Sequence, residues 1–544
     1  MMKSVTIIRV RRNFYQDSLR LMQISRRLRE LAGVVTASAV MATDANLKML
    51  GAQRLLSEDV GALGPNDLLV TIEADSRENA DRAAETIDLL EASPIATSHG
   101  ADDFESLDAA AVALRAPNLA LVSVPGMYAK IEVAKAIERG MHTFLFSDNV
   151  PVEEEIELKE RAASRDLLVM GPECGTAIIN GVGLGFANVV RRGPVGIVAA
   201  AGTGLQEVAS LIHRGGAGIS HAIGIGGRDL SRSVGGIMAA QALRLLLRDS
   251  STRVVLLVSK PPDDSVARNI VSLLLAADKP AVVCFVGKTM KSPAPERLHF
   301  SATLHDAAQK AVELLGYRNH LGDLSPDGSI WRSRAQKLAK ALAPRQRYVR
   351  GLFSGGTLCY EAQHVLWQRV RPVYSNAPLF GGNKLDDPNR SRGHCVVDLG
   401  HEEFTHSRLH PMIDSSMRAE RLLKEAIDPT VAVILFDIVL GYVAAPDPAG
   451  DLVAAIKEAT ITGSRRGRKV AFVAHVCGTD EDPQNLTAQE EKLESAGVLV
   501  LATNALAAET AAWIATRGAA SIASSTNKYA RVARKQRQAK SQIH

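Results

Sequence analysis

The chain contains one short sequence pattern twice. Residues 196–208 read Gly-Ile-Val-Ala-Ala-Ala-Gly-Thr-Gly-Leu-Gln-Glu-Val, and residues 351–362 read Gly-Leu-Phe-Ser-Gly-Gly-Thr-Leu-Cys-Tyr-Glu-Ala. In each copy an apolar run leads into a Gly-Thr turn, and an amphipathic stretch follows with a glutamate (Glu207, Glu361) four residues after the threonine. This pattern is typical of a buried strand that turns sharply into a helix. Two copies therefore predict two related lobes.

The start of each predicted helix is a candidate anion site. Unpaired N–H groups and the positive end of the helix dipole favour phosphate there. We expect both helix ends to converge on one phosphoryl group. The predicted phosphate-binding residues are Gly202, Thr203, Gly204, Gly355, Gly356 and Thr357. A plainer interpretation makes Thr203 and Thr357 N-caps that stabilise each helix by about 1 kcal/mol.

The repeat continues beyond the turns and indicates the fold class. Apolar runs at 254–258 and 281–286 in the first copy correspond to runs at 431–435 and 470–473 in the second, which has a longer insertion after its first helix. Alternation of such runs with helical patterns predicts an α/β protein with parallel sheets and right-handed crossovers.

Length predicts several domains, because 544 residues exceed what one hydrophobic core supports. The expected segments are a ferredoxin-like or ACT-like unit at 1–100, a Rossmann-like unit at 114–192, two flavodoxin-like lobes at 194–318 and 347–520, and a basic disordered tail at 521–544. The tail holds much of the net charge of +5, and no nucleic-acid partner is predicted from it.

Composition and cysteine spacing predict a cytoplasmic protein. Apolar residues make up 46% of the chain and charged residues 23%, as in ordinary globular proteins. The five cysteines are widely spaced and form no CxxC pair, so we expect free thiols in a reducing compartment and no zinc site. No run is long enough to span a membrane, and the N-terminus is interpreted as a first strand and not as a signal peptide.

The carboxyl ends of three further predicted strands mark a binding crevice, because ligands of open parallel sheets bind at this edge. The strands at 119–124, 143–146 and 167–170 each run into a polar or glycine-rich turn. The predicted lining residues are Pro125, Ser147, Asp148, Cys174, Gly175 and Thr176. A buried thiol is the favoured role of Cys174, with a nucleophile as the alternative.

Several motifs resemble a known family of ligases. Residues 171–229 contain Gly-Pro-Glu-Cys-Gly, the first Gly-Thr-Gly turn and a Gly-Ile-Gly-Gly-Arg-Asp segment, and this stretch resembles the α subunit of succinyl-CoA synthetase. With the segments 147–150, 410–414 and 440–442 included, residues 1–520 more closely resemble the FdrA-type branch of acyl-CoA synthetase-like proteins. The resemblance implies a CoA-binding domain at 114–192 followed by two CoA-ligase lobes. CoA is thus a candidate ligand, and no cofactor is required.

The chain departs from the synthetases at their central histidine. In that family a histidine in a Gly-His-Ala-Gly-Ala segment carries the phosphoryl group, whereas residues 297–302 here read Arg-Leu-His-Phe-Ser-Ala, with Phe300 at the histidine position and His299 one residue away. The acidic residue that ends the next strand in the family is replaced by Ser259 and Lys260 in the first lobe, and Asp437 occupies that point in the second. No ATP-grasp domain is recognisable, so a nucleotide-driven ligase would need one from another polypeptide.

These features predict a transferase that handles phosphate without a phosphohistidine. Two helix ends stabilise a dianion without covalent chemistry, which suits a phosphoryl group that arrives on an acyl or carbamoyl phosphate or leaves as phosphate. The FdrA-type resemblance implies an oxamate carbamoyltransferase, which converts oxalurate and phosphate to oxamate and carbamoyl phosphate in allantoin breakdown. It also implies a small carboxylic acid substrate and partner subunits, expected from the same operon.

The remaining candidates are assigned from residue type, strand-end position and the resemblance. Asp437 and Lys260 are the predicted catalytic residues, with His299 as a third if a one-residue shift restores the histidine. The side chains expected to bind the substrate are Lys260, Arg228 and Arg418, which would neutralise its carboxylate, and His410 and Asp414 in a substrate loop.

Three alternatives are weighed against this interpretation. The group of His394, His401, His406 and His410 with Asp398 and Asp414 matches no standard metal-site spacing, so no metal site is predicted. An ADP-forming acyl-CoA synthetase subunit would be favoured if His299 lay near Gly202 and Gly356. A non-catalytic scaffold that binds CoA or a metabolite would be favoured by a crevice without converging polar groups.

Overall fold

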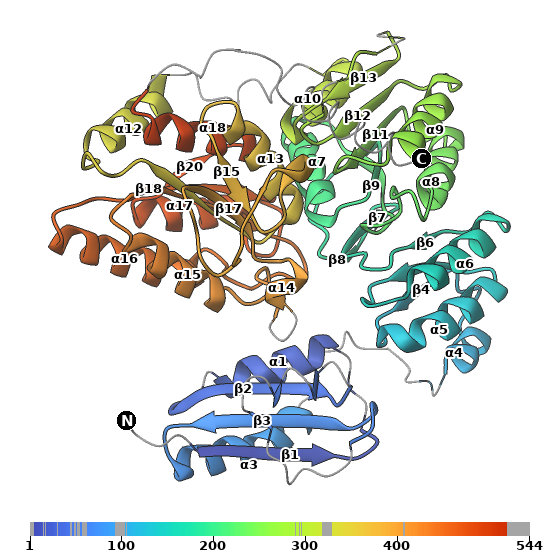
Figure 1. The fold of residues 1–544 in the computed structure, drawn as a ribbon. Helices are drawn as coiled ribbons and strands as arrows, with labels where there is room; N and C mark the ends of the chain where they lie inside the picture. Colours follow the sequence, from blue (N-terminus) through green and yellow to red (C-terminus); the bar gives the residue numbers. More distant parts are fainter. Residues whose placement is uncertain are drawn as a thin grey trace, which may run out of the picture.

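The computed structural model describes residues 5–14, 16, 18–29, 31–43, 46–47, 50–51, 55–56, 63–92, 104, 106–288, 290–292, 294, 296–317, 329–405 and 409–518. Within these residues the strands form four sheets, which are arranged along the chain as a small N-terminal unit, a second small unit and two large lobes (Figure 1). The tail predicted at 521–544 lies outside the described residues. No helix of the described part is both long and apolar enough to cross a membrane.

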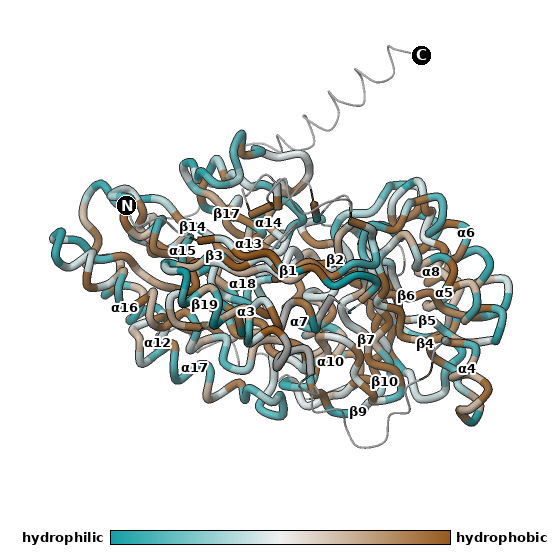
Figure 2. The backbone as a smooth tube through the Cα atoms, turned by 90° about the horizontal axis from the view of Figure 1, so that it is seen from below, coloured by the Kyte–Doolittle hydropathy of each residue, from teal (hydrophilic) through white to brown (hydrophobic). Residues whose placement is uncertain are grey.

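The N-terminal unit is a small antiparallel sheet with two helices. The strands β1 (Val5–Arg11), β2 (Val34–Met41) and β3 (Leu68–Ala74) pair in the order β1-β3-β2. Helices α1 (Ser18–Arg29) and α3 (Arg77–Ala92) share one apolar cluster with alternate residues of these strands, such as Ile7 and Ile72, so they cover one face of the sheet. Hydrophobic stretches along β2 and β3 are visible in Figure 2.

The second unit alternates strands and helices. Its parallel strands are β4 (Leu119–Val122), β5 (His142–Leu145) and β6 (Val169–Met170), and its helices are α4 (Leu107–Ala113), α5 (Gly126–Glu138) and α6 (Val152–Ala163). Because the strands are parallel, the turns after β4, β5 and β6 lie at one edge of the sheet.

The first lobe has a sheet in the order β13-β12-β11-β9-β10-β7-β8. Its parallel strands are β9 (Arg192–Ala199), β10 (Ile219–Gly224), β11 (Val254–Ser259), β12 (Ala281–Phe285) and β13 (Leu298–Ser301), and its helices are α7 (Gly202–Arg214), α8 (Ile237–Arg248), α9 (Asp264–Leu275) and α10 (Leu304–Leu314). The hairpin of β7 (Thr176–Ile179) and β8 (Val182–Gly185) pairs antiparallel to β10. The hairpin thus joins this sheet, although the boundary predicted at residues 192–194 places it in the preceding segment.

The second lobe repeats this path with the expected insertion. Its parallel strands, in the order β16-β15-β17-β14-β18-β19-β20, are β14 (Tyr348–Phe353), β15 (Val373–Ser375), β16 (Asn383–Lys384), β17 (His394–Asp398), β18 (Val431–Val439), β19 (Ala471–Cys477) and β20 (Leu499–Leu501). Its helices are α12 (Ser329–Lys340), α13 (Gly356–Trp367), α14 (Glu402–Thr405), α15 (Ser416–Ala426), α16 (Gly450–Arg465), α17 (Leu486–Ser495) and α18 (Asn504–Ala515). The insertion after α13 contains β15 and β16, so β17 occupies the place beside β14 that β10 has beside β9.

The two lobes share one hydrophobic core. Residues of α7 and α10 from the first lobe and of α13 and α18 from the second belong to a single buried cluster, represented by Leu205, Ala311, Leu358 and Ala511. These helices form a layer between the two sheets, with α7 beside α13 (Figure 1). Because α7 follows β9 and α13 follows β14, this packing brings the N-termini of both helices to the lobe interface.

Candidate functional site

The two Gly-Thr turns meet in a reciprocal contact. A Cβ atom placed on Gly355 would lie 2.8 Å from both Oγ1 and Cγ2 of Thr203, and a Cβ atom on Gly204 would lie 2.8 Å from Cγ2 of Thr357. Each threonine therefore packs against a glycine of the other lobe, and any larger residue at either glycine would push the lobes apart. The structure thus brings together the six residues predicted at the turns: Gly202, Thr203, Gly204, Gly355, Gly356 and Thr357.

Both helix N-termini are uncapped by side chains. The N-cap residues are Ala201 for α7 and Gly355 for α13, and neither makes a side-chain capping hydrogen bond. Thr203 and Thr357 are each the second residue of their helix, so the interpretation of these threonines as N-caps is wrong. The first-turn N–H groups of both helices are thus donors that point out of the helix ends, as an anion site requires.

Asp437 holds the second turn from within the core. Its Oδ1 accepts hydrogen bonds from the Ser354 N–H at 2.8 Å and from Arg418 Nη1 at 2.8 Å, and its Oδ2 accepts one from the Gly355 N–H at 2.9 Å. The Asp437 side chain is fully buried, and Arg418 is buried with it. Asp437 therefore positions the backbone of the turn. Arg418 was predicted to neutralise the substrate carboxylate, but in the structure it neutralises Asp437.

Asp398 lies at the same turn and accepts fewer hydrogen bonds than Asp437. It ends β17, and its Oδ1 accepts a hydrogen bond from the Gly400 N–H at 3.0 Å. A Cβ atom on Gly356 would lie 2.8 Å from its Oδ2, so this oxygen faces the start of α13. Burial and the charge of Asp437 raise the pKa of Asp398 to about 7, against the opposing effects of the Gly400 hydrogen bond and of Lys260.

Lys260 reaches this place from the first lobe. It follows β11, and its Nζ lies 5.9 Å from the centroid of the Tyr360 ring in the first turns of α13. The positive charge of Lys260 acts to lower the pKa of Asp398. Of the predicted catalytic residues, Lys260 is therefore the one that the structure places beside the turns with its charged group in an exposed position.

His410 lies beside the second turn as a neutral donor. Its Nδ1 accepts a hydrogen bond from the Met412 N–H at 3.3 Å, so the proton of the neutral ring is on Nε2. A Cβ atom on Gly400 would lie 2.6 Å from both this Nε2 and the Ser354 carbonyl oxygen. Burial lowers the pKa of His410 to about 4, with a smaller effect of Arg418 in the same direction. The ring can donate a hydrogen bond to an anion, and its protonated Nε2 is not a nucleophile.

Two other predicted residues lie away from the turns. Asp414 pairs with Arg29 of α1, with 2.9 Å between Oδ2 and Nη2, and so faces the N-terminal unit. Arg228 pairs with Glu155 of α6 at 3.0 Å and donates a hydrogen bond to the Val150 carbonyl oxygen at 2.8 Å. It therefore ties the loop after β10 to the second unit.

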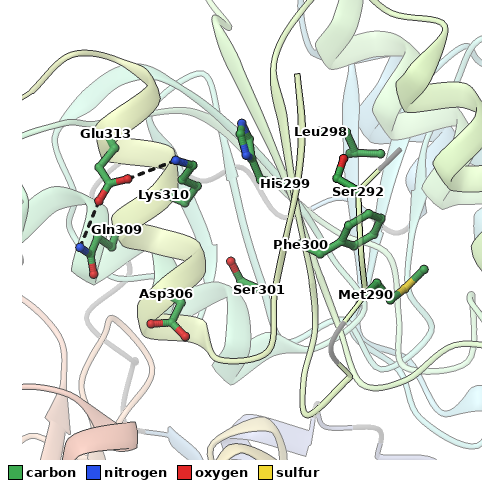
Figure 3. Close-up of a pocket in the computed structure, with 10 residues that line it drawn as sticks. All are labelled: Met290, Ser292, Leu298, His299, Phe300, Ser301, Asp306, Gln309, Lys310 and Glu313. Carbon is green, nitrogen blue, oxygen red and sulfur yellow. Dashed lines mark hydrogen bonds and ion pairs between the residues drawn. The ribbon is translucent and has the colours of Figure 1, made fainter. Parts of the chain in front are cut away.

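The structure does not bring His299 to the turns. It lies on the edge strand β13 at the level of Val282, which is aligned through Leu256 with Ile197, five residues before Gly202. Three strand spacings separate β13 from β9, which is about 14 Å. The ring lines a pocket of about 390 Å³ with side chains of α10 such as Lys310 and Glu313 (Figure 3).

The predicted crevice residues lie in loops that lead to the first turn. The loops after β4 and β5 touch, because a Cβ atom on Gly126, next to Pro125, would lie 2.2 Å from the Asp148 carbonyl oxygen. Thr176 Oγ1 lies 3.4 Å from a Cβ position on Gly202. Among the other predicted residues, Ser147 and Gly175 lie in the same run of loops, Ser147 with a buried side chain.

Cys174 is a buried thiol, as the favoured interpretation has it. Burial raises the pKa of Cys174 to about 12, so the thiol is neutral and is a poor nucleophile. All five cysteines are free and buried. Among the described residues no group of three or more histidine, cysteine and carboxylate side chains is arranged to hold a metal ion, and His406 lies outside them.

The shared helix layer contains a polar cluster that the sequence does not predict. Glu207 of α7 crosses to the second lobe, where its Oε2 lies 2.8 Å from His475 Nε2, and Glu361 of α13 crosses to the first lobe, where its Oε1 accepts a hydrogen bond from the Leu304 N–H at 2.6 Å. The Oε2 of Glu361 also accepts a hydrogen bond from Asn504 Nδ2 at 2.7 Å. The repeated glutamates were the available signal, but their partners are too distant in sequence to be inferred.

The two glutamates of this cluster differ in protonation. Burial opposes ionisation of Glu207, but the charge and hydrogen bond of His475, together with Cys477 and Arg214, outweigh it and lower the Glu207 pKa. Burial and the charge of Glu207 raise the pKa of Glu361 to about 7. The layer thus contains one ionised and one readily protonated carboxyl group.

Comparison with known proteins places the chain in a family. It is 40% identical over 502 residues to the uncharacterized protein YahF of Escherichia coli K12, a match that covers 92% of this chain and 96% of YahF. The CoA-ligase family model matches residues 352–514, and the model of the AllF heavy metal-associated domain matches residues 2–105. The chain therefore belongs to the CoA-ligase family. Within it, the chain shares nearly its full length with YahF and carries an AllF-type N-terminal domain.

Weaker similarities extend to ligase subunits. The chain is 24% identical over 232 residues to the ADP-forming sulfoacetate-CoA ligase subunit SqwL of Acholeplasma sp, covering 41% of this chain and 74% of SqwL. It is 26% identical over 223 residues to the mitochondrial ADP-forming succinate–CoA ligase subunit alpha-2 of Trichomonas vaginalis, covering 38% and 71%. The solved apo form of the dinucleotide-forming acetyl-coenzyme A synthetase 1 of Ca. Korarchaeum cryptofilum matches with a TM-score of 0.32 at 15% identity over 78% of this chain and 88% of that one, too weakly to argue from.

The composition of the N-terminal domain bears on its family name. Residues 2–105 contain no cysteine and a single histidine, His99. Thiolate and imidazole are the ligands that soft metal ions prefer. The sequence of this domain therefore lacks the thiolate ligands usual for such an ion. The family model that matches it is that of a heavy metal-associated domain and not of an ACT domain, the alternative weighed from the sequence.

Proposed function

We propose that the chain catalyses phosphate-dependent carbamoyl or acyl transfer, and that its reaction is the conversion of oxalurate and phosphate to oxamate and carbamoyl phosphate in allantoin and purine nitrogen catabolism. The observation that carries this proposal is the reciprocal contact of two uncapped helix N-termini. The AllF-type domain at 2–105 supports the pathway.

The proposed site holds phosphate between the two lobes. Each helix N-terminus contributes roughly half a positive charge, so the pair and Lys260 together balance a phosphate dianion. A phosphate oxygen attacks the ureido carbonyl carbon of oxalurate, and the nitrogen of oxamate leaves. The Nε2–H of His410 would donate to an oxygen of the substrate.

The proposal also includes a ligand-binding role for the second unit and a division of the chain into domains. Thr176 follows the loop after β6 and lies beside Gly202 of the first turn, which supports a ligand that extends from one to the other, with CoA as a candidate. The five parallel strands of the first lobe follow the order 2-1-3-4-5, which supports a flavodoxin-like lobe. We propose a ferredoxin-like unit at 1–100, a Rossmann-like unit at 114–192 whose β7–β8 hairpin pairs with the sheet of the first lobe, and lobes at 194–318 and 347–520.

An ADP-forming acyl-CoA synthetase subunit is the second candidate. The similarity to ADP-forming ligase subunits favours it. The place of His299 at the edge of the first sheet weighs against it, because the phosphoryl carrier of such an enzyme must reach the phosphate site. The non-catalytic scaffold is disfavoured by the polar groups that converge on the turns, Lys260, Asp398 and His410.

Phosphorus NMR on the protein co-purified with its operon neighbours distinguishes these candidates. Carbamoyl phosphate and oxamate are supplied first, and then ATP, CoA and a panel of acids. Release of phosphate only in the first mixture is the expected result. Formation of ADP with a transient phosphohistidine signal would contradict the proposal and support the synthetase.

Calorimetry tests the phosphate site directly. The double variant T203V/T357V places a methyl group where each hydroxyl lies, and we expect its phosphate affinity to fall. The control is T487V, since Thr487 is exposed on α17 in the same protein. Equal phosphate affinities in wild type and T203V/T357V would refute the phosphate site.

A further inference from the structure

Asp398 has one carboxylate oxygen that its surroundings leave unused. Its backbone is fixed on both sides by Asn376, whose Oδ1 accepts a hydrogen bond from the Asp398 N–H at 2.9 Å and whose Nδ2 donates one to the Asp398 carbonyl oxygen at 3.0 Å. The residue is 7% exposed. Oδ1 accepts a hydrogen bond from Gly400, but among the described residues no donor reaches Oδ2, which faces the first residue of α13. An unpaired oxygen on a carboxyl group this buried loses part of its hydration, and a bound ligand or a proton offsets that cost.

The contrast with Asp437 shows that this arrangement is specific. Both carboxylates stand at the second turn, on strands that flank β14. Both oxygens of Asp437 accept backbone N–H groups, and Arg418 balances its charge. Asp437 is thus fully occupied by the fold, whereas Asp398 is held in place and keeps one oxygen free at the anion site.

The titratable and charged side chains near Asp398 come from several elements of both lobes. Asp437 on β18 and Lys260 after β11 are the charged neighbours that act on its ionisation. Cys359 and Tyr360 on α13 are neutral, because burial raises the pKa of both, with a smaller effect of the Asp398 charge in the same direction. His410 is the neutral ring beside Gly400. One cation and one anion thus oppose each other, and burial decides the balance.

We propose that Asp398 is the proton carrier of the transfer reaction, an inference that rests on the function proposed above. As a phosphate oxygen forms its bond to the ureido carbonyl carbon, the proton of the monohydrogen phosphate passes to the free Oδ2 of Asp398. The bond between that carbon and the oxamate nitrogen then breaks, and the nitrogen takes the proton from Asp398. The products are carbamoyl phosphate and oxamate, and the carboxylate is regenerated.

The chemistry of the leaving group requires such a carrier. An amide nitrogen departs as a strongly basic anion unless a proton reaches it as the bond breaks. A positioned acid or base contributes about 10²- to 10⁴-fold to such steps, and it works best when its pKa lies near the operating pH. A carboxyl group with a pKa of about 7, such as Asp398, can both accept and return the proton.

The test compares wild type with D398N and D398E in the complex with the partner proteins. We expect D398N to lower kcat by about 10²- to 10⁴-fold in both directions, with the phosphate KM unchanged or lower, and D398E to retain part of the rate. The control is D386N, because Asp386 is exposed in the same lobe. A wild-type kcat and pH profile in D398N would overturn the inference and leave the proposed function intact.

A second measurement does not depend on the reaction. Sulfate stays a dianion between about pH 6 and pH 8.5, and we expect its calorimetric affinity for wild type to weaken by about tenfold over this range, as Asp398 ionises. D398N should bind sulfate with a constant affinity. Equal pH dependence in the two proteins would overturn the placement of Asp398 at the anion site. A wild-type complex that converts neither oxalurate nor carbamoyl phosphate would instead overturn the proposed function, and with it the proton-carrier role.

Discussion

The two lobes follow the same path of strands and helices but differ in what holds the turn before the first helix. In the first lobe the backbone alone does so at Ala200, whose N–H donates to the Val258 carbonyl oxygen at 3.0 Å. In the second lobe the buried carboxylate of Asp437 accepts two N–H groups of the turn, and Arg418 neutralises it. The same turn geometry is therefore reached with and without buried charge.

This difference extends to the groups that face the interface. The first lobe contributes the cation Lys260 there, and the second contributes the carboxyl group of Asp398. Duplication thus explains the paired helix ends, whereas divergence of the strand ends explains why one lobe supplies a cation and the other an acid. A single lobe would have only half of these groups.

Breaking the charged support of the second turn has the largest expected effect. Arg418→Ala leaves the Asp437 carboxylate in the core without its cation, and we expect the free energy of unfolding to fall by about 3–5 kcal/mol. Urea denaturation measures it. Arg390→Ala is the control, since the Arg390 side chain is 84% exposed in its pair with Asp387, and about 1 kcal/mol or less is expected. An equal loss of unfolding free energy in both variants would contradict the role of Arg418 as the buried partner of Asp437.

The repeated glutamates should respond to pH with opposite signs. The pKa of Glu361 is about 7 in the fold against 4.5 ordinarily, so the folded state binds its proton more tightly, and stability is lost as pH rises from 4.5 to 7. Glu361→Gln cannot ionise, so its stability relative to wild type should rise over this window, by up to about 3 kcal/mol.

Glu207→Gln is the matched comparison for that effect. The pKa of Glu207 is lowered, because its pairing with His475 outweighs burial, so its contribution to stability is present above pH 4.5 and is lost as pH falls below it. Relative to wild type, Glu207→Gln should therefore be less stable near neutral pH. Urea denaturation at several pH values checks both variants, and the same sign in both would refute the assigned difference.

The reciprocal contact of the turns should be sensitive to a single methyl group. Gly355→Ala and Gly204→Ala each place a Cβ atom 2.8 Å from a threonine of the other lobe, and we expect each to cost about 1–3 kcal/mol and to weaken phosphate binding. Thermal unfolding and calorimetry measure these effects. Gly227→Ala is the control, because a Cβ atom there meets no atom within 4 Å.

The smallest expected effect concerns the cation of the first lobe. Lys260→Met should weaken phosphate binding by about tenfold, or about 1.4 kcal/mol. It should also raise the pKa of Asp398, because Lys260 favours the ionised carboxylate, so the pH profile of the reaction shifts upward. Lys384→Met, at an exposed position of β16, is the control for calorimetry. Unchanged phosphate affinity in Lys260→Met would exclude the lysine from the site.

The features that sequence predicted well are those set by local chemistry. The Gly-Thr turns, the order of strands and helices, and the insertion in the second lobe are all encoded in short segments, and the structure has them at those places. Cys174 is buried in the short loop between β6 and β7, close after the apolar run that the sequence shows. The predicted resemblance to succinyl-CoA synthetase-like proteins is confirmed by the comparisons.

The features that sequence missed depend on partners far along the chain. Glu207 meets His475 across 268 residues, and no local pattern distinguishes this contact from a surface glutamate. The sequence associates Asp398 only with a possible metal site. The insertion separates β14 from β17 along the chain, so their pairing in the sheet cannot be inferred from local patterns. Arg418 and Asp414 were assigned to substrate because their actual partners, Asp437 and Arg29, lie on other elements.

The shared helix layer has a consequence for how the chain folds. The apolar faces of α7 and α10 are covered by α13 and α18, so neither lobe can complete its core alone. Helix α13 begins 154 residues after the start of α7, and α18 begins 200 residues after the start of α10. Contacts of such long sequence separation form slowly and disappear together. The two lobes should therefore open as one cooperative unit, with the amide hydrogens of these four helices exchanging only when the whole pair unfolds.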